Sequence, residues 1–296
     1  MLSIKTRGFI DLIRPFTLLA PIIVSICIII ASFIYNGYGK INSFFWYNII
    51  LASISLALLN GASNALNQIT DLKTDKISKP YRPIPRGDVK AYEALVISVL
   101  LYFISFVLSI FISPIFCLFI ILIIIFTVTY SIPPRLKDKL YFNMLWIGIP
   151  RGLLGILASW SIYGNIMHPL PVTIGFIAMV YLIGGSITKD ITDAKADKKT
   201  GTITLVNKYG IRNAAIMVLP LMIFPFIFIP MLIHAGFLDF QFIYLSLLVI
   251  PSFFVFYLMI RDNTKVKKLE NSSSWAFMYA TYFLFVFGFS MLTIFG

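Results

Sequence analysis

Long apolar runs alternate with short polar segments along the whole chain. A run of about 18 to 25 mostly apolar residues is long enough to cross a bilayer as a helix. Only Ser113 and Pro114 separate the third run from the fourth, which predicts a tight helical hairpin there. The pattern therefore predicts an all-α protein with nine transmembrane helices, at residues 10–35, 45–68, 92–112, 114–131, 143–163, 170–188, 211–234, 239–260 and 274–295.

The composition agrees with a membrane location. Of the 296 residues, 59% are hydrophobic and 12% are charged, whereas a soluble domain carries about 25% charged residues. No segment between the runs is long enough to fold alone, so residues 1–296 are expected to form a single membrane domain. The first run is longer than the apolar part of a signal peptide and no small-residue cleavage site follows it, so it is interpreted as a spanning helix.

The basic residues fall almost entirely on one side of the predicted topology. Of the 24 lysines and arginines, Lys40 alone is expected on the other side. The positive-inside rule then places the N-terminus, and the polar loops at about 67–91 and 189–210, on the cytoplasmic side of the cell membrane. The net charge of +12 is explained by this topology and by anionic head groups. No soluble basic face with aromatic readers is present, so nucleic-acid binding is not expected.

Two ladders of oxygen-bearing side chains stand out in these polar loops. Within each ladder the residues recur four apart, so on a helix they stack on one face. Carboxylates beside a membrane are costly unless a cation or a substrate needs them. The first ladder comprises Asn67, Asp71 and Asp75, and the second comprises Asp193 and Asp197 with Asp190 extending it.

The ladders, with lysines and arginines around them, predict a magnesium site for a phosphorylated substrate. Mg²⁺ binds through one or two carboxylates together with phosphate oxygens, and it stabilises a departing diphosphate. Two ladders on the same side favour a diphosphate held between two metal clusters over solvated acids that merely balance nearby lysines. Zinc is disfavoured, because neither His168 nor His234 has a second ligand at zinc spacing.

Four segments together resemble the UbiA-type superfamily of intramembrane prenyltransferases. The first ladder with the following segment Lys79-Pro-Tyr-Arg-Pro-Ile-Pro-Arg-Gly87 is similar to the first family signature. The second ladder, followed by Lys198-Lys-Thr-Gly201 and by Thr204-Leu205, is similar to the second. Tyr130-Ser-Ile-Pro-Pro134 resembles the segment between them, and Ile13-Arg14-Pro15 resembles the opening of the first helix. The resemblance covers nearly the whole chain in the expected order.

The resemblance implies a bundle of nine helices around a central cavity that opens laterally to lipid. In the family, Mg²⁺ on two aspartate motifs holds a prenyl diphosphate, and the prenyl group passes to an acceptor. One diphosphate contact is implied in the loop after the middle segment, where Lys137 is the first candidate and Arg135 and Lys139 are the alternatives. The implied metal ligands are Asn67, Asp71, Asp75, Asp190, Asp193 and Asp197, the implied diphosphate contacts are Asn67, Arg14, Arg82, Lys137 and Lys189, and the implied catalytic residues are Asp71, Asp75, Asp193, Asp197 and Tyr130.

Four further residues carry open interpretations. Tyr130 is expected near the allylic carbon, where a ring face stabilises positive charge, or else in the aromatic belt at the membrane interface. Arg151 is expected to contact the acceptor or a phosphate, or else to extend to the interface. Gln68 replaces an aspartate found in many family members and so removes one possible ligand. Arg86 replaces a common serine and is expected to add positive charge near the diphosphate.

The predicted reaction is metal-assisted ionisation of an allylic diphosphate, such as geranylgeranyl diphosphate, and capture of the cation by an acceptor. The KPYRPIP segment and the second ladder most resemble family members that act on geranylgeranylglyceryl phosphate or on chlorophyllide. Isoprenoid-lipid synthesis is therefore the leading interpretation, with the hydroxybenzoate or naphthoate acceptors of quinone synthesis as the alternative. An ion-coupled secondary transporter is disfavoured, because transporters place such acids near the bilayer midplane. CDP-alcohol phosphotransferases are disfavoured because their glycine-bearing aspartate pattern is absent.

Overall fold

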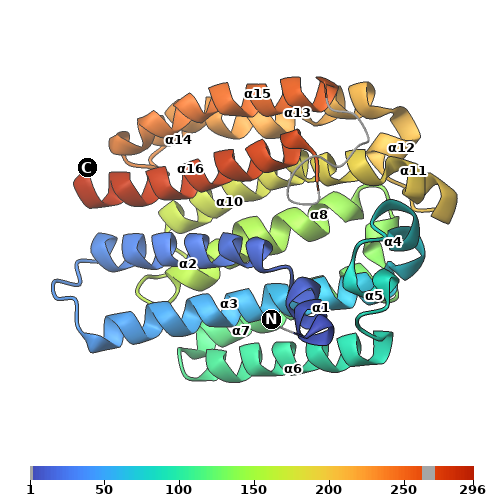
Figure 1. The fold of residues 1–296 in the computed structure, drawn as a ribbon. Helices are drawn as coiled ribbons and strands as arrows, with labels where there is room; N and C mark the ends of the chain where they lie inside the picture. The colour runs from blue at the N-terminus through green and yellow to red at the C-terminus, as the bar shows by residue number, and fades with distance from the viewer. Residues whose placement is uncertain (1–2, 262–270) are drawn as a thin grey trace.

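The computed structural model describes residues 3–261 and 271–296 as a bundle of roughly parallel helices (Figure 1). Among these residues, eight helices are long and apolar enough to cross a membrane. Lys265, Lys267 and Lys268, which the predicted topology counts on the cytoplasmic side, lie outside the described residues. The all-α prediction is confirmed.

Five of the spans are single helices and three are composite. The composite spans change helix type along their length, and the span Phe142–Trp160 contains a π-helical turn, η2. The first four single helices are α2 (Pro15–Tyr35), α3 (Ser43–Thr70), α6 (Ala91–Ile110) and α7 (Pro114–Ser131). The composites are α8 (Phe142–Gly148) with η2 (Ile149–Leu154) and α9 (Gly155–Trp160), then α10 (Pro169–Gly185) with η3 (Ser186–Lys189) and α11 (Asp190–Thr200), and η4 (Phe240–Leu248) with α15 (Val249–Arg261). The last described element, α16 (Ser273–Phe295), is a single apolar helix and completes the eight.

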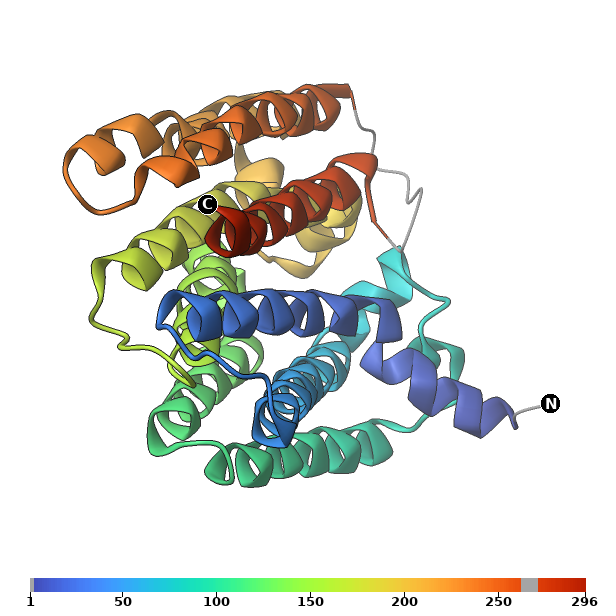
Figure 2. The same ribbon diagram turned by 90° about the vertical axis from the view of Figure 1, so that its left-hand side faces the viewer.

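The first predicted helix is wrong at its start, because residues 10–35 are not continuous. A separate helix, α1 (Ile4–Ile13), ends at Arg14, whose φ of 54° lies in the left-handed region. Proline disfavours the helical conformation for the residue before it, so Pro15 starts a new helix instead of extending the old one. Figures 1 and 2 both show α1 turned away from the axis of α2.

The run at residues 211–234 is also divided. It folds as α13 (Ile211–Ile227) and α14 (Ile229–His234), and neither piece reaches the length of a full span. Pro220 and Pro225 lie inside α13 and each removes a backbone donor from the helix. The expected count of nine spans is therefore reduced to eight and one interrupted helix in the described part of the chain.

Small polar side chains join the spanning helices to one another. The Ser55 hydroxyl donates to the Ser105 carbonyl at 2.9 Å, and the Ser105 hydroxyl donates to the Ser55 carbonyl at 2.8 Å. These reciprocal bonds hold α3 against α6. Similarly, the Ser290 hydroxyl of α16 donates to the Cys27 carbonyl of α2 at 3.0 Å. Small residues allow close helix approach and satisfy their own hydrogen bonds in the process, which suits packing in lipid.

Short helices that carry the polar motifs gather at one end of the bundle (Figure 1). Lys40 lies in the connection between α2 and α3 at the other end, as the charge pattern predicts. Arg151 does not fit the expectation that every basic residue except Lys40 lies at the polar end. It is the tenth of the 19 residues in the span Phe142–Trp160 and so lies at the middle of that span. The short helices at the polar end are α4 (Leu72–Ser78), α5 (Pro83–Arg86), η1 (Leu136–Asp138) and α12 (Leu205–Tyr209).

A glycine substitution tests the packing of the π-helical turn. A Cβ added to Gly152 would lie 2.4 Å from the Met179 Cα on α10, whereas one added to Gly61 would meet no atom closer than 3.6 Å. We expect Gly152→Ala to lower the free energy of unfolding by roughly 1–3 kcal/mol. Gly61→Ala, the matched control inside α3, is expected to be neutral or slightly stabilising. Melting temperatures in detergent measure both, and an unchanged value for Gly152→Ala would contradict the tight approach.

Candidate active site

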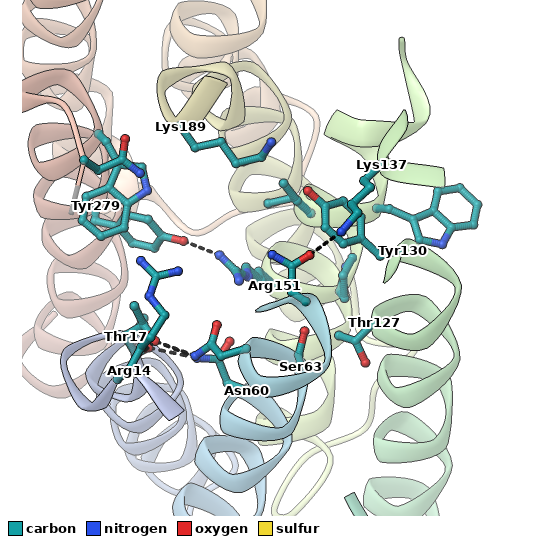
Figure 3. A pocket seen from close by; sticks show the side chains of 18 of the residues that line it. Arg14, Thr17, Asn60, Ser63, Thr127, Tyr130, Lys137, Arg151, Lys189 and Tyr279 are labelled. Carbon is teal, nitrogen blue, oxygen red and sulfur yellow. Dashed lines mark hydrogen bonds between the residues drawn. The ribbon is translucent and has the colours of Figure 1, made fainter. Parts of the chain in front are cut away.

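A cavity lined by the described residues connects the polar end of the bundle with its apolar interior. Its volume is about 510 Å³, and residues of both ladders line it. Farther in, the wall is formed by apolar side chains of α2, α7 and α16, including Pro21, Ile123 and Phe283. Figure 3 shows several polar side chains on opposite walls pointing into this space. The cavity therefore accommodates a ligand that is ionic at one end and apolar at the other.

The first ladder keeps its four-residue spacing across a change of helix. Asn67 lies in the last turn of α3, Asp71 lies at the junction, and Asp75 lies in α4. The Asp71 N–H donates to the Asn67 carbonyl at 2.9 Å, and the Asp75 N–H donates to the Asp71 carbonyl at 2.8 Å. The helical hydrogen-bond pattern thus continues through the junction, which keeps the three side chains on one side. All three line the cavity.

Lys137 draws two members of the first ladder together. Its ammonium lies 2.8 Å from the Asn67 Oδ1 and 2.6 Å from the Asp71 Oδ1. Burial lowers the pKa of Lys137, while Asp71 acts in the opposite direction. Arg135 pairs with Asp71 at 3.0 Å but does not line the cavity, and Lys139 does not line it either. Of these three candidates, the structure places Lys137 at the site.

Asp75 is paired separately and more deeply. The Arg82 guanidinium donates to its two carboxylate oxygens at 2.9 and 2.8 Å, and both side chains are buried. Burial raises the pKa of Asp75, and the charges of Arg82 and Lys79 oppose that effect. A buried carboxylate is stable in its charged form when a guanidinium satisfies it in this way.

The second ladder is organised by Lys189 and Asn143. Lys189 forms an ion pair with Asp190, and its ammonium also lies 3.1 Å from the Asn143 Oδ1. The Asn143 amide donates to Asp190 at 3.1 Å. Asp197 is also buried, yet in the part of the chain that the structure describes its carboxylate receives no hydrogen bond and forms no ion pair. Asn143 was missed by the sequence analysis, although a polar residue at the start of an apolar run is a usable signal.

The two ladders face each other across the cavity. Lys79, from the segment that follows the first ladder, donates to Asp193 of the second at 2.6 Å. Beside this pair, the Thr74 hydroxyl of α4 donates to the Thr200 hydroxyl of α11 at 3.2 Å. The predicted juxtaposition of the ladders is thus present, and Lys79 is a cavity residue to which the sequence analysis gave no role.

Tyr130 lines the cavity, which favours its predicted role beside the substrate over a place in the aromatic belt. Its hydroxyl donates to the Asn143 Oδ1 at 3.0 Å, and the Lys137 ammonium lies 5.8 Å from its ring centroid. Figure 3 shows Tyr130 and Lys137 on the same wall. The ring face is already close to one positive charge, which is the property that the predicted role requires.

A second polar stripe, missed by the sequence analysis, supports the break at Arg14. The Asn64 amide donates to the Ile13 carbonyl at 3.0 Å, and the Gln68 amide donates to the Leu12 carbonyl at 2.7 Å. Asn60 lies one helical turn before Asn64 on the same face of α3, and its amide donates to the Thr17 carbonyl at 3.1 Å. Gln68 therefore caps the end of α1, which explains a polar residue at that position.

Of the two arginines near the end of α1, Arg14 lines the cavity and Arg86 does not. Arg14 lines the cavity, and its guanidinium carbon lies 5.3 Å from the Phe16 ring centroid. Arg86 does not line it, because it pairs with Asp11 at 3.0 Å and with Asp88. The expectation that Arg86 adds charge near the diphosphate is therefore wrong. Its ion pairs instead attach the first motif loop to α1.

The donor set suits a hard divalent cation. Within residues 3–261 and 271–296, no three His, Cys, Asp or Glu side chains lie close enough together to hold a metal ion as they stand. However, Asn67 and Asp71 already converge on one cation, the Lys137 ammonium, and Asp197 presents a buried carboxylate without a partner there. Carboxylate and amide oxygens on both walls are the ligands that Mg²⁺ prefers. The residues present therefore fit Mg²⁺.

Comparisons with known proteins agree with this architecture. The model of the UbiA prenyltransferase family matches residues 24–281. The digeranylgeranylglyceryl phosphate synthase of Methanosphaera stadtmanae is 28% identical over 263 residues, which cover 87% of this chain and 89% of that protein. The protein of the same name from Methanosarcina barkeri is 30% identical, with 75% and 77% covered. The probable homogentisate phytyltransferase 2 of Oryza sativa is 30% identical, with 69% of this chain and 56% of that protein covered.

Solved structures share the fold. A UbiA homolog from Archaeoglobus fulgidus bound to GPP and Mg²⁺ superposes with a TM-score of 0.70 at 18% identity, covering 96% of this chain and 99% of that one. A structure from work on digeranylgeranylglyceryl phosphate synthase in membranes gives a TM-score of 0.69 at 24% identity, covering 98% and 99%. At these identities the likeness establishes the fold and not the substrate.

The buried Asp75–Arg82 pair gives a stability prediction. We expect Arg82→Gln to lower the free energy of unfolding by about 3 kcal/mol, because it leaves the Asp75 carboxylate buried without its guanidinium. The double variant Arg82→Gln with Asp75→Asn should recover part of that loss. Lys5→Gln, which breaks the exposed pair with Glu93, serves as the control and should leave the melting temperature unchanged. Equal melting temperatures for the wild type and Arg82→Gln would disprove the importance of the buried pair.

Proposed function

The chain belongs to the UbiA prenyltransferase family, and on this basis we propose that it attaches a geranylgeranyl chain to a glycerophosphate-type lipid acceptor within the membrane. It is a multi-pass membrane prenyltransferase. The donor would be a polyprenyl diphosphate, as for the homolog that was solved with GPP. The lipid acceptor is supported by similarity over most of the chain to proteins named digeranylgeranylglyceryl phosphate synthase.

The observation that carries this proposal is the pair of facing ladders at the polar end of an otherwise apolar cavity. Asp71 of the first ladder pairs with Lys137, and Asp193 of the second ladder pairs with Lys79. A diphosphate needs cations and metal ligands on both sides, and a prenyl chain needs an apolar tunnel behind them. Both requirements are met in one space of about 510 Å³.

Magnesium is the proposed cofactor, held by Asn67, Asp71, Asp75, Asp190, Asp193 and Asp197. When bound, Mg²⁺ would supply positive charge that stabilises diphosphate as a leaving group. The homolog from Archaeoglobus fulgidus was solved with GPP and Mg²⁺, which supports this assignment.

The basic side chains have a direct role in this scheme. Arg82, Lys137 and Lys189 are paired with ladder oxygens, so they are already positioned to bind phosphate oxygens when a diphosphate arrives. Arg14 lines the same cavity, and its predicted contact with the diphosphate remains a proposal.

The cavity wall governs the fate of the prenyl group. As the bond between the allylic carbon and the diphosphate oxygen breaks, the electron pair leaves with the diphosphate and the carbon becomes positive. The face of the Tyr130 ring would stabilise that charge. The apolar interior would exclude water, which would otherwise convert the cation to an alcohol. The acceptor hydroxyl oxygen would then form the new bond to the allylic carbon, and its proton would pass to the departing diphosphate.

The orientation in the membrane is part of the proposal. The charge pattern supports placing the N-terminus and both ladders on the cytoplasmic side of the cell membrane. A transporter function is less consistent with the geometry, because the ladders lie at the end of the bundle and not at its middle (Figure 1).

Substitution of one aspartate on each wall tests the metal site. We expect Asp71→Ala and Asp193→Ala each to reduce Mg²⁺-dependent diphosphate release by at least about 100-fold, because charge stabilisation of the leaving group is lost. Removal of Mg²⁺ with a chelator should have the same effect on the wild type. Asp11→Asn, an acid outside the cavity, is the control and should retain activity. Unchanged turnover in both alanine variants, verified as folded, would refute the proposed site.

A donor–acceptor matrix with mass analysis of the products tests the substrate. Purified protein is incubated with geranylgeranyl diphosphate and, in separate reactions, geranylgeranylglyceryl phosphate, 4-hydroxybenzoate, a dihydroxynaphthoate, homogentisate or chlorophyllide. We expect product with the glyceryl phosphate. Product with an aromatic acid alone would overturn the lipid assignment. The aromatic acceptors are included because the chain is also similar to a probable homogentisate phytyltransferase.

A further inference from the structure

Arg151 is a cation at the middle of a membrane-spanning segment, and it lines the cavity. It is the tenth residue of the 19-residue span Phe142–Trp160, so it lies about 14 Å from either end. Its side chain lines the cavity and donates to the Tyr279 hydroxyl, which favours a contact with the acceptor or a phosphate over extension to the interface. A charged side chain at this depth is costly and marks a site that uses the charge.

The surrounding helices hold Arg151 in place through two tyrosines of α16. The Arg151 guanidinium donates to the Tyr279 hydroxyl, and the Tyr282 hydroxyl donates to the Arg151 carbonyl at 3.0 Å. That carbonyl belongs to the π-helical turn η2, and such turns often accompany functional sites. Both the backbone and the head group of Arg151 are therefore fixed by contacts with a distant part of the chain.

The charge of Arg151 is not balanced by the protein that the structure describes. In residues 3–261 and 271–296 the Arg151 side chain forms no ion pair, and its hydrogen-bond partner is the neutral Tyr279 hydroxyl. By contrast, Asp71, Asp75 and Asp193 each pair with a lysine or arginine at the polar end. The ladders therefore leave Arg151 unneutralised, and a ligand anion would supply the missing charge.

We propose that Arg151, oriented by Tyr279, binds the phosphate of the lipid acceptor and thereby selects phosphorylated acceptors. This deepens the proposed function and rests on it. Figure 3 shows the Arg151 head group in the open space between Tyr279 and Tyr130. Arg151 and Tyr130 line the same cavity, and in a glycerol phosphate the reacting hydroxyl is only a few bonds from the phosphate. Guanidinium binds phosphate through two parallel hydrogen bonds, which suits this task better than an ammonium.

The experiment compares Arg151→Gln with wild type on two acceptors, geranylgeranylglyceryl phosphate and geranylgeranylglycerol. We expect the variant to raise the KM for the phosphorylated acceptor by roughly 10- to 100-fold, since a charge-assisted hydrogen bond is lost. The KM for geranylgeranyl diphosphate should stay within about twofold of wild type. The preference for the phosphorylated acceptor over the alcohol should fall by the same factor. Arg151→Lys should retain part of that preference.

Control variants separate this role from a structural one. Arg212→Gln removes an exposed arginine of α13 that does not line the cavity. It should leave kcat and the KM values for the donor and both acceptors unchanged. Tyr279→Phe should raise the KM for the phosphorylated acceptor by a smaller factor than Arg151→Gln. A rise in the KM for the donor, or an equal loss with both acceptors, would overturn the proposal.

Binding measurements keep the test decisive if the proposed function itself fails. If wild type forms no product with geranylgeranylglyceryl phosphate, the proposed acceptor is wrong, and the subsite is then tested by binding alone. Thermal stabilisation by geranylgeranylglyceryl phosphate, absent with geranylgeranylglycerol and lost in Arg151→Gln, would support the phosphate site. Equal stabilisation of wild type and Arg151→Gln would reject it.

Discussion

The rest of the structure depends on neutralising charge at the edge of an apolar bundle. Acids and bases that lie far apart in the sequence meet at the mouth of one cavity. Lys79 pairs with Asp193, and Lys137 joins Asn67 to Asp71. In a low-dielectric setting an unpaired charge is far more costly than in water, so these pairs fix how the motif loops sit against one another. The geometry of the site follows from that constraint.

The same ion pairs explain how a cavity rich in acids can bind an anion. In the structure the basic side chains satisfy the carboxylates, and apolar residues line the rest of the same cavity. A metal that replaced lysine on the ladder oxygens would free that lysine for phosphate. In the proposed function, one set of contacts thus holds both the ligands for a cation and the donors for a diphosphate, while Arg151 lies apart at the middle of its span.

Breaks in the helices contribute as much as the helices themselves. The end of α1 at Arg14 exposes carbonyls that Asn64 and Gln68 satisfy from α3. In the π-helical turn, the Arg151 carbonyl accepts a hydrogen bond from the Tyr282 hydroxyl of α16. In lipid, backbone groups released from a helix need partners within the protein. The polar side chains that provide them also line the cavity or lie next to it.

The sequence alone determined the apolar spans, their shared charged side and the two ladders, because helix length, charge bias and four-residue spacing are local properties. It also singled out Asn67, Asp71, Asp75, Asp193 and Asp197, whose spacing survives in the structure even where α3 gives way to α4. Only the tertiary structure decided that Lys137 and not Lys139 lines the cavity, that Gln68 caps α1, that Arg86 faces away, and that Arg151 meets Tyr279. Those outcomes depend on contacts between residues up to 128 positions apart, and no local pattern encodes which partner a long polar side chain will meet across a packed bundle.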